Sequence, residues 1–213
     1  MPSEPEVQRP RRRSYDEIHR LLVDAAAELF AEKGYTGTTT KEIGLRAGVS
    51  EVMLFRHFGS KARLFSEASL QPFNDFLARF AADWGAHVDE QSLDEPYLRE
   101  FVAGLYDLSR ERRTLIVDLL ASAAYEPELL AGDEPLLRAL TDVAAVGQKA
   151  MARRGVDDVD SAMTARAIIT MVVATAVLGP VLFGHDPGPD GRDAVIDDLA
   201  RMAGRLIGPA RNR

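Results

Sequence analysis

The stretch TTKEIGLRAGVSEVMLFRHFGSK, from Thr39 to Lys61, decides the fold of the N-terminal part of this chain. Glu42 follows Thr39 by three residues, so the two side chains can form a reciprocal capping box that begins a helix. Gly48 suits the positive φ that ends such a helix, and Ser50 can cap a second one. Two short helices around a single glycine predict a helix-turn-helix.

Apolar residues of this motif can pack inward at Ile43, Ala47, Val49, Leu54 and Phe58. A second helix lying in the major groove of DNA presents its first outward residues to base edges and its later ones to phosphates. The outward positions are Glu51, Val52, Met53, Phe55, Arg56 and His57. The motif therefore predicts a DNA-binding surface.

A second capping box, formed by Ser14 and Glu17, opens an upstream helix whose apolar stripe has helical spacing and ends at Gly34. We expect this helix to cover the helix-turn-helix and to complete a three-helix domain over residues 14–59.

Residues 1–13 precede this domain and combine Arg9, Arg11, Arg12 and Arg13 with three prolines. Such a composition favours disorder in isolation. The arm either orders on the minor groove or the phosphates of DNA, or is a flexible terminus that assists solubility, and the sequence leaves both possibilities open.

The ordered motifs from Phe30 to Leu64 resemble the DNA-binding domain of the TetR/AcrR family of bacterial transcriptional regulators. The resemblance rests on FAEKGY at 30–35, TTT at 38–40, AGVS at 47–50, LFRHF at 54–58 and SK at 60–61. The remainder of the chain resembles the family only in its length and helical pattern.

The resemblance implies roles for individual positions. It implies backbone phosphate contacts for Thr40, Lys41, Ser50, Phe55, His57 and Lys61, with Lys41 reaching a base in some members. Base reading would otherwise fall to Glu51, Val52 and Met53, whose side chains suit a cytosine amino group and thymine methyl groups. Phe55 departs from the tyrosine usual in the family, so only ring packing is expected there.

Three of these residues have plainer interpretations. His57 can be a solvated helix-end residue, although the motif favours phosphate contact. Arg46 either touches DNA or solvates the first helix of the motif, and the two are equally consistent with the sequence. Met53 can fill the core, as methionine often does.

Charge is divided unevenly along the chain. Residues 1–64 carry 11 lysines and arginines against 9 acidic residues, whereas residues 65–213 carry 15 against 24, within a net charge of −7. An acidic protein binds DNA if its basic groups converge on one face. The absence of cysteine excludes disulfides and thiolate metal sites, and with no signal peptide we expect a cytoplasmic protein.

Residues 60–213 keep a helical periodicity and form the expected second domain. A helix from Ser60 is followed, after Pro72, by one that carries Phe73 and Trp84. Further helices are predicted at 96–110, 113–125, 134–154, 160–183 and 191–207. The fold class is therefore all-α, a three-helix DNA-binding domain followed by a larger helical bundle.

Residues 167–183, AIITMVVATAVLGPVLF, form an almost uninterrupted apolar run. At about 1.5 Å per residue the run spans roughly 26 Å, the short limit for a bilayer, and it contains Gly179-Pro180. We therefore expect no membrane span but a helix buried on both sides, by this chain's core and by a partner subunit. Together with the last helix, this run predicts a homodimer.

The second domain is expected to hold an apolar ligand, although the same side chains can simply fill the core. The candidate lining residues are Phe76, Phe80, Trp84, Phe101, Leu105, Met151, Met163 and Met171. The scarcity of polar anchors among them indicates an elongated hydrophobic ligand.

An enzyme is the competing class. The four histidines are scattered, and the sequence contains no H-E-x-x-H, no phosphate loop and no G-x-S-x-G elbow. We therefore expect no catalytic residues, no metal site and no cofactor.

These patterns predict a sequence-specific DNA-binding regulator, a repressor released from an inverted-repeat operator in double-stranded DNA by a hydrophobic small-molecule effector. The two reading heads would lie roughly 34 Å or more apart. The alternative is a dimeric DNA-binding protein without an effector, whose second domain only dimerises or recruits a protein partner.

Overall fold

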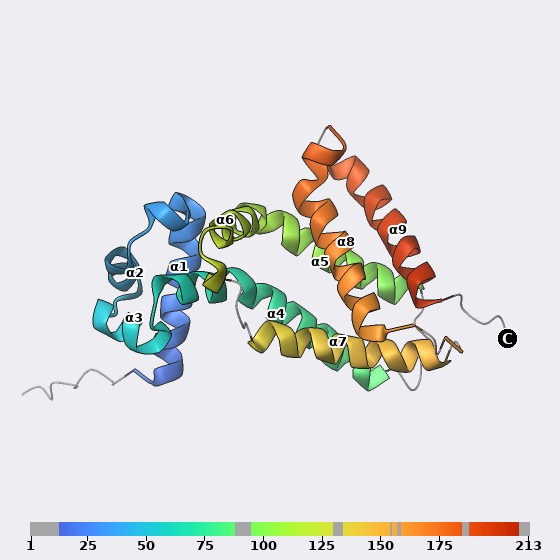
Figure 1. The fold of residues 1–213 in the computed structure, drawn as a ribbon, viewed down its shortest axis with the longest axis horizontal. Coiled ribbons are helices and arrows are strands. Elements are labelled where there is room, and N and C mark those ends of the chain that lie inside the picture. The colour runs from blue at the N-terminus through green and yellow to red at the C-terminus, as the bar shows by residue number, and fades with distance from the viewer. Residues whose placement is uncertain are drawn as a thin grey trace, which may run out of the picture.

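The computed structural model describes residues 13–87, 95–129, 134–153, 155–156, 159–184 and 188–208. Within these residues the chain forms helices and no strands (Figure 1), which confirms the all-α prediction. The elements are α1 (Tyr15–Gly37), α2 (Thr40–Ala47), α3 (Glu51–Phe58), α4 (Lys61–His87), α5 (Glu95–Glu111), α6 (Arg113–Ala123), the 3₁₀ helix η1 (Pro127–Leu129), α7 (Glu134–Arg153), α8 (Ser161–Leu182) and α9 (Gly188–Ile207). The predicted basic arm lies outside the described residues except for Arg13.

The first two helices begin at the predicted capping boxes. The side chain of Ser14 accepts a hydrogen bond from the backbone N–H of Glu17 at 3.1 Å, and that of Thr39 accepts one from Glu42 at 3.2 Å. Both glutamates reach back to the backbone of the cap. Helical geometry in α1 breaks at Gly34, where φ is 72°, so this break lies at the predicted end and only a short turn follows.

The N-terminal helices bury an apolar core that extends into later parts of the chain. Phe30 of α1 and Phe65 of α4 are at most 1% exposed, with ring centroids 4.6 Å apart. Leu115 and Leu119 of α6 and Leu129 of η1 are buried in the same core. Packing around the helix-turn-helix is therefore completed by residues well beyond the predicted boundary at residue 60.

A single helix, α4, joins the two parts of the molecule. The sequence indicated two helices separated at Pro72, but α4 passes through this proline. Pro72 has no backbone N–H, so one helical hydrogen bond is missing. Phe65 before the proline and Phe73 after it are buried in different cores, and this burial on both sides holds the helix together.

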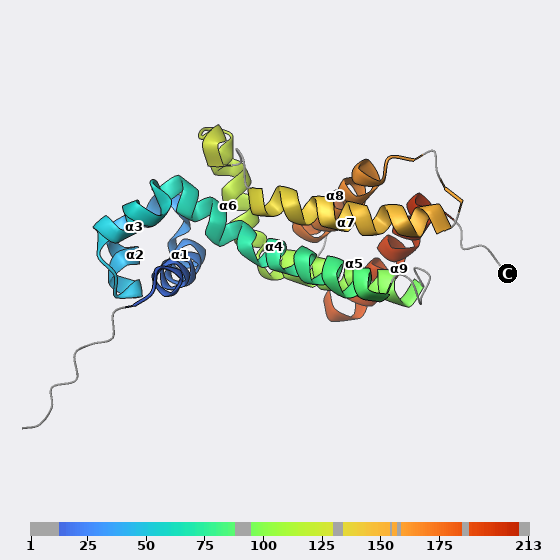
Figure 2. The ribbon, with the colours of Figure 1, turned by 90° about the horizontal axis from the view of Figure 1, so that it is seen from below.

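The remaining helices form the second core at the opposite end of an elongated molecule (Figure 1). α4 and α7 run side by side (Figure 2), and α5 packs against both α8 and α9. Tyr106, Val172 and Ile196 from α5, α8 and α9 are at most 1% exposed at the centre of this core. Burial of apolar faces is the main source of its stability.

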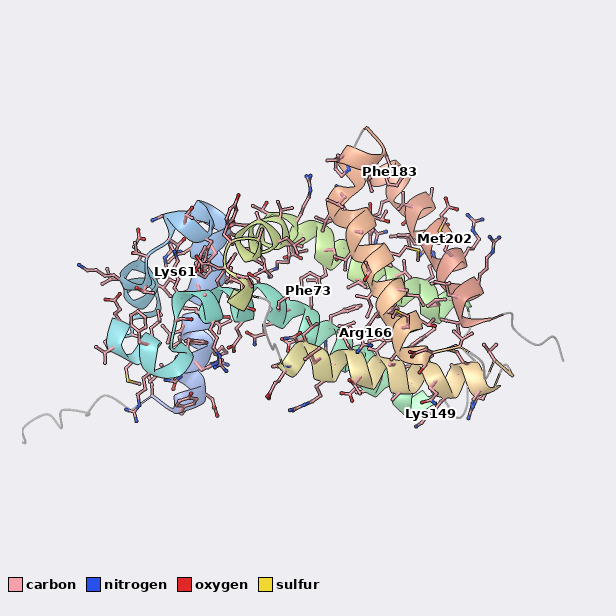
Figure 3. All side chains as sticks on the ribbon, viewed as in Figure 1. Lys61, Phe73, Lys149, Arg166, Phe183 and Met202 are labelled. Carbon is pink, nitrogen blue, oxygen red and sulfur yellow. The ribbon has the colours of Figure 1, made fainter. Side chains whose placement is uncertain are left out.

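Among the described residues, α8 is the one helix that is long and apolar enough to cross a membrane. It packs against α5 and α7, yet only 28% of its most apolar window is buried within the chain. Large apolar side chains remain exposed at the C-terminal end of α8 and along α9, where Figure 3 labels Phe183 and Met202. They are Leu178, Val181, Leu182 and Phe183, followed by Met202 and Leu206.

Candidate nucleic-acid interface and ligand cavity

The turn between α2 and α3 has the predicted geometry. Gly48 adopts the left-handed conformation with φ 62° and ψ 38°, and the backbone N–H of Val49 donates to the carbonyl of Gly44 at 2.9 Å. The side chain of Ser50 accepts from the backbone N–H of Met53 and caps α3. These local bonds fix the angle between the two helices.

Gly44 is a further glycine that this turn requires, and the sequence analysis missed it. A Cβ atom at Gly44 would lie 2.8 Å from the backbone carbonyl oxygen of Val49, closer than van der Waals contact allows. The sequence signal for this requirement was the position of Gly44, four residues before Gly48. A residue there faces the turn, where the close backbone leaves room only for glycine.

α3 has a buried face and an exposed face, with half-buried residues between them. Leu54 and Phe58 are at most 2% exposed, whereas Val52 is 77% and Phe55 is 46% exposed. Glu51 and Arg56 are also exposed, and Met53 is half-buried. The exposed side is the face predicted to read DNA, and it is unusually apolar for a surface helix.

Two candidate contact residues are linked across the turn. The hydroxyl of Thr40, at the start of α2, donates to the carboxylate of Glu51, at the start of α3. Lys41 beside them is exposed. The hydrogen bond orients the Glu51 carboxylate at the end of α3 that would approach base edges.

Arg46 is engaged within the domain. Its guanidinium lies 2.8 Å from a carboxylate oxygen of Glu28 and 3.5 Å from one of Glu32, both on α1. The hydrogen bonds to these carboxylates raise the pKa of Arg46 above its ordinary value. The ion pairs tie α2 to α1, so they favour the intramolecular role that the sequence left open.

His57 lies beneath an aromatic side chain of α1. Its ring stacks on Tyr15 with centroids 4.0 Å apart, and His19 lies 6.0 Å away. Neither ring nitrogen of His57 is exposed or has a hydrogen-bond partner among the described residues. Burial lowers the pKa of His57, and the nearby His19 and Arg56 lower it further.

Lys61 points back into the molecule at the start of α4. Its ammonium nitrogen lies 4.2 Å from the centroid of the Tyr35 ring. Burial lowers the pKa of Lys61, while the carboxylates of Glu126 and Asp118 oppose that shift. The predicted phosphate contact stays a prediction, and it would require this side chain to leave these partners.

Tyr35 joins the DNA-binding domain to α6 and the segment after it, a junction that the sequence analysis missed. Its backbone N–H donates to a carboxylate oxygen of Asp118 at 2.6 Å, and its hydroxyl donates to Glu126 at 2.8 Å. Burial, followed by this hydrogen bond, raises the pKa of Tyr35 to about 12. The partners are more than 80 residues apart in sequence, so local patterns gave no signal for them.

An apolar cavity lies at the other end of the molecule, where α4, α5, α7, α8 and α9 converge. The space is about 430 Å³, including its opening to solvent. Four of the eight predicted ligand residues, Phe80, Trp84, Phe101 and Met151, line it. Phe80 and Phe101 are in ring contact at 4.3 Å, which gives one wall an aromatic surface.

The other four predicted ligand residues lie elsewhere. Phe76 lines a separate groove between α1, α4 and α5, and Leu105 is fully buried in the core. Met163 is 62% exposed on the outside of α8, and Met171 packs against the second core away from the cavity. Apolar character alone could not distinguish these positions because all of them fit a helical stripe.

The remaining lining residues were not predicted. They are Leu98, Val143, Gly147, Ser161, Thr164, Ala165, Ile168 and Ile207. The four on α8 recur at helical spacing and form its inward face. Among the described residues the lining contains no charged side chain, and the hydroxyl of Thr164 already donates to the carbonyl of Asp160 at 2.9 Å. The cavity therefore suits a neutral apolar molecule.

Sequence comparison identifies relatives of the helix-turn-helix. Residues 22–68 match the sequence model of the family described as bacterial regulatory proteins, tetR family. The HTH-type transcriptional regulator UidR of Escherichia coli strain K12 is 26% identical over 153 residues, which cover 70% of this chain and 75% of UidR.

Solved structures share the fold of the whole chain. A protein of Mesorhizobium loti MAFF303099 described as a TetR-family transcriptional regulator matches with a TM-score of 0.69 and 24% identity, covering 92% of this chain and 97% of that one. The transcriptional regulator FadR of Bacillus subtilis, solved in complex with stearoyl-CoA, matches with a TM-score of 0.61 and 16% identity, covering 91% and 100%. The helix-turn-helix of this chain therefore matches that of the TetR family of bacterial transcriptional regulators, and the whole chain shares the fold of TetR-family structures.

Proposed function

We propose that this protein is a cytoplasmic repressor that binds an inverted-repeat operator as a homodimer and leaves it when a neutral apolar effector occupies the helical domain. The proposal of DNA binding rests on the exposed face of α3. The turn at Gly48 holds this helix at a fixed angle to α2. A rigid exposed helix of two turns fits the major groove.

The proposed contacts divide into two groups. Thr40, Lys41 and Ser50 at the helix starts, together with Phe55 and Arg56, face the sugar-phosphate backbone. Glu51, Val52 and Met53 face base edges, where a carboxylate accepts from cytosine and the apolar side chains contact thymine methyl groups. Arg46 is left out of this set because two carboxylates of α1 already neutralise it.

The partner subunit is proposed to cover the apolar side chains at the end of α8 and along α9. Val181 is 76% exposed and Leu182 is 64% exposed, and Met202 of the neighbouring helix is 50% exposed. Exposed large apolar side chains on two neighbouring helices favour a protein interface. A second copy presents the same face, so a two-fold axis would bury both and hold two reading heads for two half-sites.

The proposed effector is compact rather than elongated. The enclosed part of the cavity is only about 40 Å³, far below the roughly 300–1,000 Å³ of ligand pockets, so the surrounding side chains would have to move apart to admit even a small effector. FadR of Bacillus subtilis was solved with stearoyl-CoA, but the described residues that line the cavity in this chain include no cation to hold a carboxylate or phosphate. We therefore propose a neutral aromatic or branched aliphatic molecule.

Operator binding is tested by selecting duplexes from fragmented genomic DNA with the full-length protein and mapping the protected bases. We expect a palindromic footprint. The variant Lys41→Ala is expected to lower the slope of log affinity against log salt by about one for each phosphate that residue 41 no longer neutralises. Lys149→Ala is the matched control, because this exposed lysine lies on α7, far from the helix-turn-helix (Figure 3). An equal change in both variants would contradict the assigned role of Lys41.

Effector binding is tested by thermal unfolding in the presence of neutral aromatic compounds, branched alkanes, fatty acids and acyl-CoA. We expect a neutral compound to raise the melting temperature and to release the operator. Ala165→Phe, which fills the cavity, should abolish both effects, whereas Ala145→Phe on the exposed face of α7 should not. If no compound acts on the wild-type protein although it binds DNA, the alternative of a regulator without an effector is favoured.

A further inference from the structure

α3 supplies few groups that can bind the DNA backbone. Its exposed side chains include Val52 and Phe55, which cannot donate hydrogen bonds, and Arg56 is its one lysine or arginine. Most protein–DNA hydrogen bonds go to the backbone, so neighbouring elements must provide the missing donors. The N-terminal end of α1, which lies beside α3, is such an element (Figure 1).

Two contacts hold this end of α1 against the helix-turn-helix. The guanidinium of Arg13 donates to the carbonyl of Gly48, in the turn before α3, at 2.8 Å. Tyr15 stacks on His57, in the last turn of α3, with centroids 4.0 Å apart and planes inclined by 23°. Residues 13–15 are therefore fixed to two points that flank α3.

Tyr15 remains 60% exposed despite this stacking. Its ring covers His57, whose ring nitrogens are shielded and have no partner among the described residues. The geometry therefore offers the phenol hydroxyl, rather than the imidazole, to a group approaching from outside. A tyrosine hydroxyl is a good donor to a phosphate oxygen.

We propose that Tyr15 is a DNA-contact residue whose hydroxyl donates to a backbone phosphate beside the C-terminal end of α3, and that His57 is a positioning residue that supports its ring. This inference rests on the proposed DNA-binding function. It moves the phosphate contact expected of His57 to a residue of α1 that lies outside the helix-turn-helix.

Three full-length variants test this assignment on the operator duplex selected with the wild-type protein. Tyr15→Phe keeps the ring and removes the hydroxyl, so affinity should fall roughly tenfold. The reduction should be equal for all operator variants, because phosphate contacts carry no sequence information, and the salt slope should stay unchanged, because no cation is removed. His57→Phe keeps the stacking surface under Tyr15, so its affinity should fall much less than that of Tyr15→Phe. Tyr125→Phe, at an exposed tyrosine outside the DNA-binding domain, is the control and should also bind normally.

Far-UV circular dichroism and the urea midpoint of each variant establish that the fold is retained. Wild-type affinity for Tyr15→Phe would overturn the inference, and so would a strong decrease for His57→Phe at unchanged stability, because the imidazole would then be the donor. Both results leave the proposed function intact, since the wild-type protein still binds its operator. If the wild-type protein binds no duplex, the proposed function and this inference fail together.

Discussion

The helix-turn-helix and the helical domain are built from the same kind of secondary structure but are specified differently. In the first, polar side chains and glycines at fixed positions decide where each short helix begins and ends, as with Thr39 and Gly48. In the second, long helices are placed by burial of residues such as Tyr106 and Val172. The candidate DNA-binding surface is therefore set by local bonds, whereas the cavity is the space that helix packing leaves unfilled.

The two regions meet at α6, so neither is independent of the other. Leu115 and Leu119 of α6 belong to the N-terminal core, while Ile116 between them belongs to the second core. Asp118 of the same helix binds the backbone of Tyr35. A displacement of α6 would therefore disturb both cores and this hydrogen bond at once.

The largest expected effect comes from Phe65→Ala, which tests whether the regions unfold separately. Phe65 is fully buried between Phe30 and Tyr35, so its removal should cost about 3–5 kcal/mol of unfolding free energy. Trp84, the only tryptophan, reports on the second region. Because α6 joins the cores, we expect tryptophan fluorescence and far-UV circular dichroism to shift to the same lower urea midpoint.

The control for this variant is Leu45→Ala, at a residue that is 75% exposed on α2, and it should leave both midpoints in place. Two separate transitions in Phe65→Ala, with the fluorescence midpoint unmoved, would instead mean that the helical domain folds alone.

A pair of glycine substitutions contrasts the two regions directly. Gly44→Ala would place its Cβ 2.8 Å from the carbonyl oxygen of Val49, so we expect a destabilisation of about 1–3 kcal/mol and weaker operator binding. Gly85→Ala in α4 meets only Val146 at 3.9 Å, so it should stabilise the helix by about 0.4–1 kcal/mol. Urea denaturation measures the change in unfolding free energy for each variant. Changes of the same sign would contradict the proposed difference in how the two regions are specified.

Asp118→Asn tests the junction itself. The amide oxygen can still accept from the N–H of Tyr35, but the negative charge is removed, so about 1 kcal/mol of stability should disappear. Asp142→Asn, at an exposed residue of α7, is the matched control and should be neutral. A stability equal to that of the control would show that the charge of Asp118 contributes nothing to the contact.

The smallest effect concerns pH. The pKa of Tyr35 is raised from 10.0 to about 12 in the folded chain, because its burial and its bond to Glu126 favour the neutral phenol. The unfolded chain ionises first, so the stabilisation is complete below pH 10 and is lost as pH rises from 10 to 12. The urea midpoint of the wild type should therefore approach that of Tyr35→Phe as pH rises from about 10 to about 12.

Other tyrosines titrate in both proteins and cancel in this comparison. A gap between the two midpoints that stays constant over this pH interval would argue that the hydroxyl of Tyr35 is not held neutral by the junction.

Much of the candidate DNA-binding surface was predictable because its determinants lie close together in sequence. The capping pair Thr39 and Glu42, the glycine at 48 and the cap at Ser50 act within a few residues of each other. The stacking of Tyr15 on His57 was not predictable, because Tyr15 lies far before His57 in the sequence and belongs to another helix. Pro72 was misread as a helix break because burial on both of its sides outweighs one missing hydrogen bond.

The sequence alone therefore determined the helical class, the helix-turn-helix with its caps and turn, and the resemblance of this motif to that of a family of regulators. Only the tertiary structure decided which apolar residues enclose the cavity, that Arg46 pairs with α1, and that Asp118 and Glu126 hold Tyr35. The physical reason is range: capping and turn formation depend on neighbours in the chain, whereas cavities and long-range polar contacts depend on how whole helices pack together.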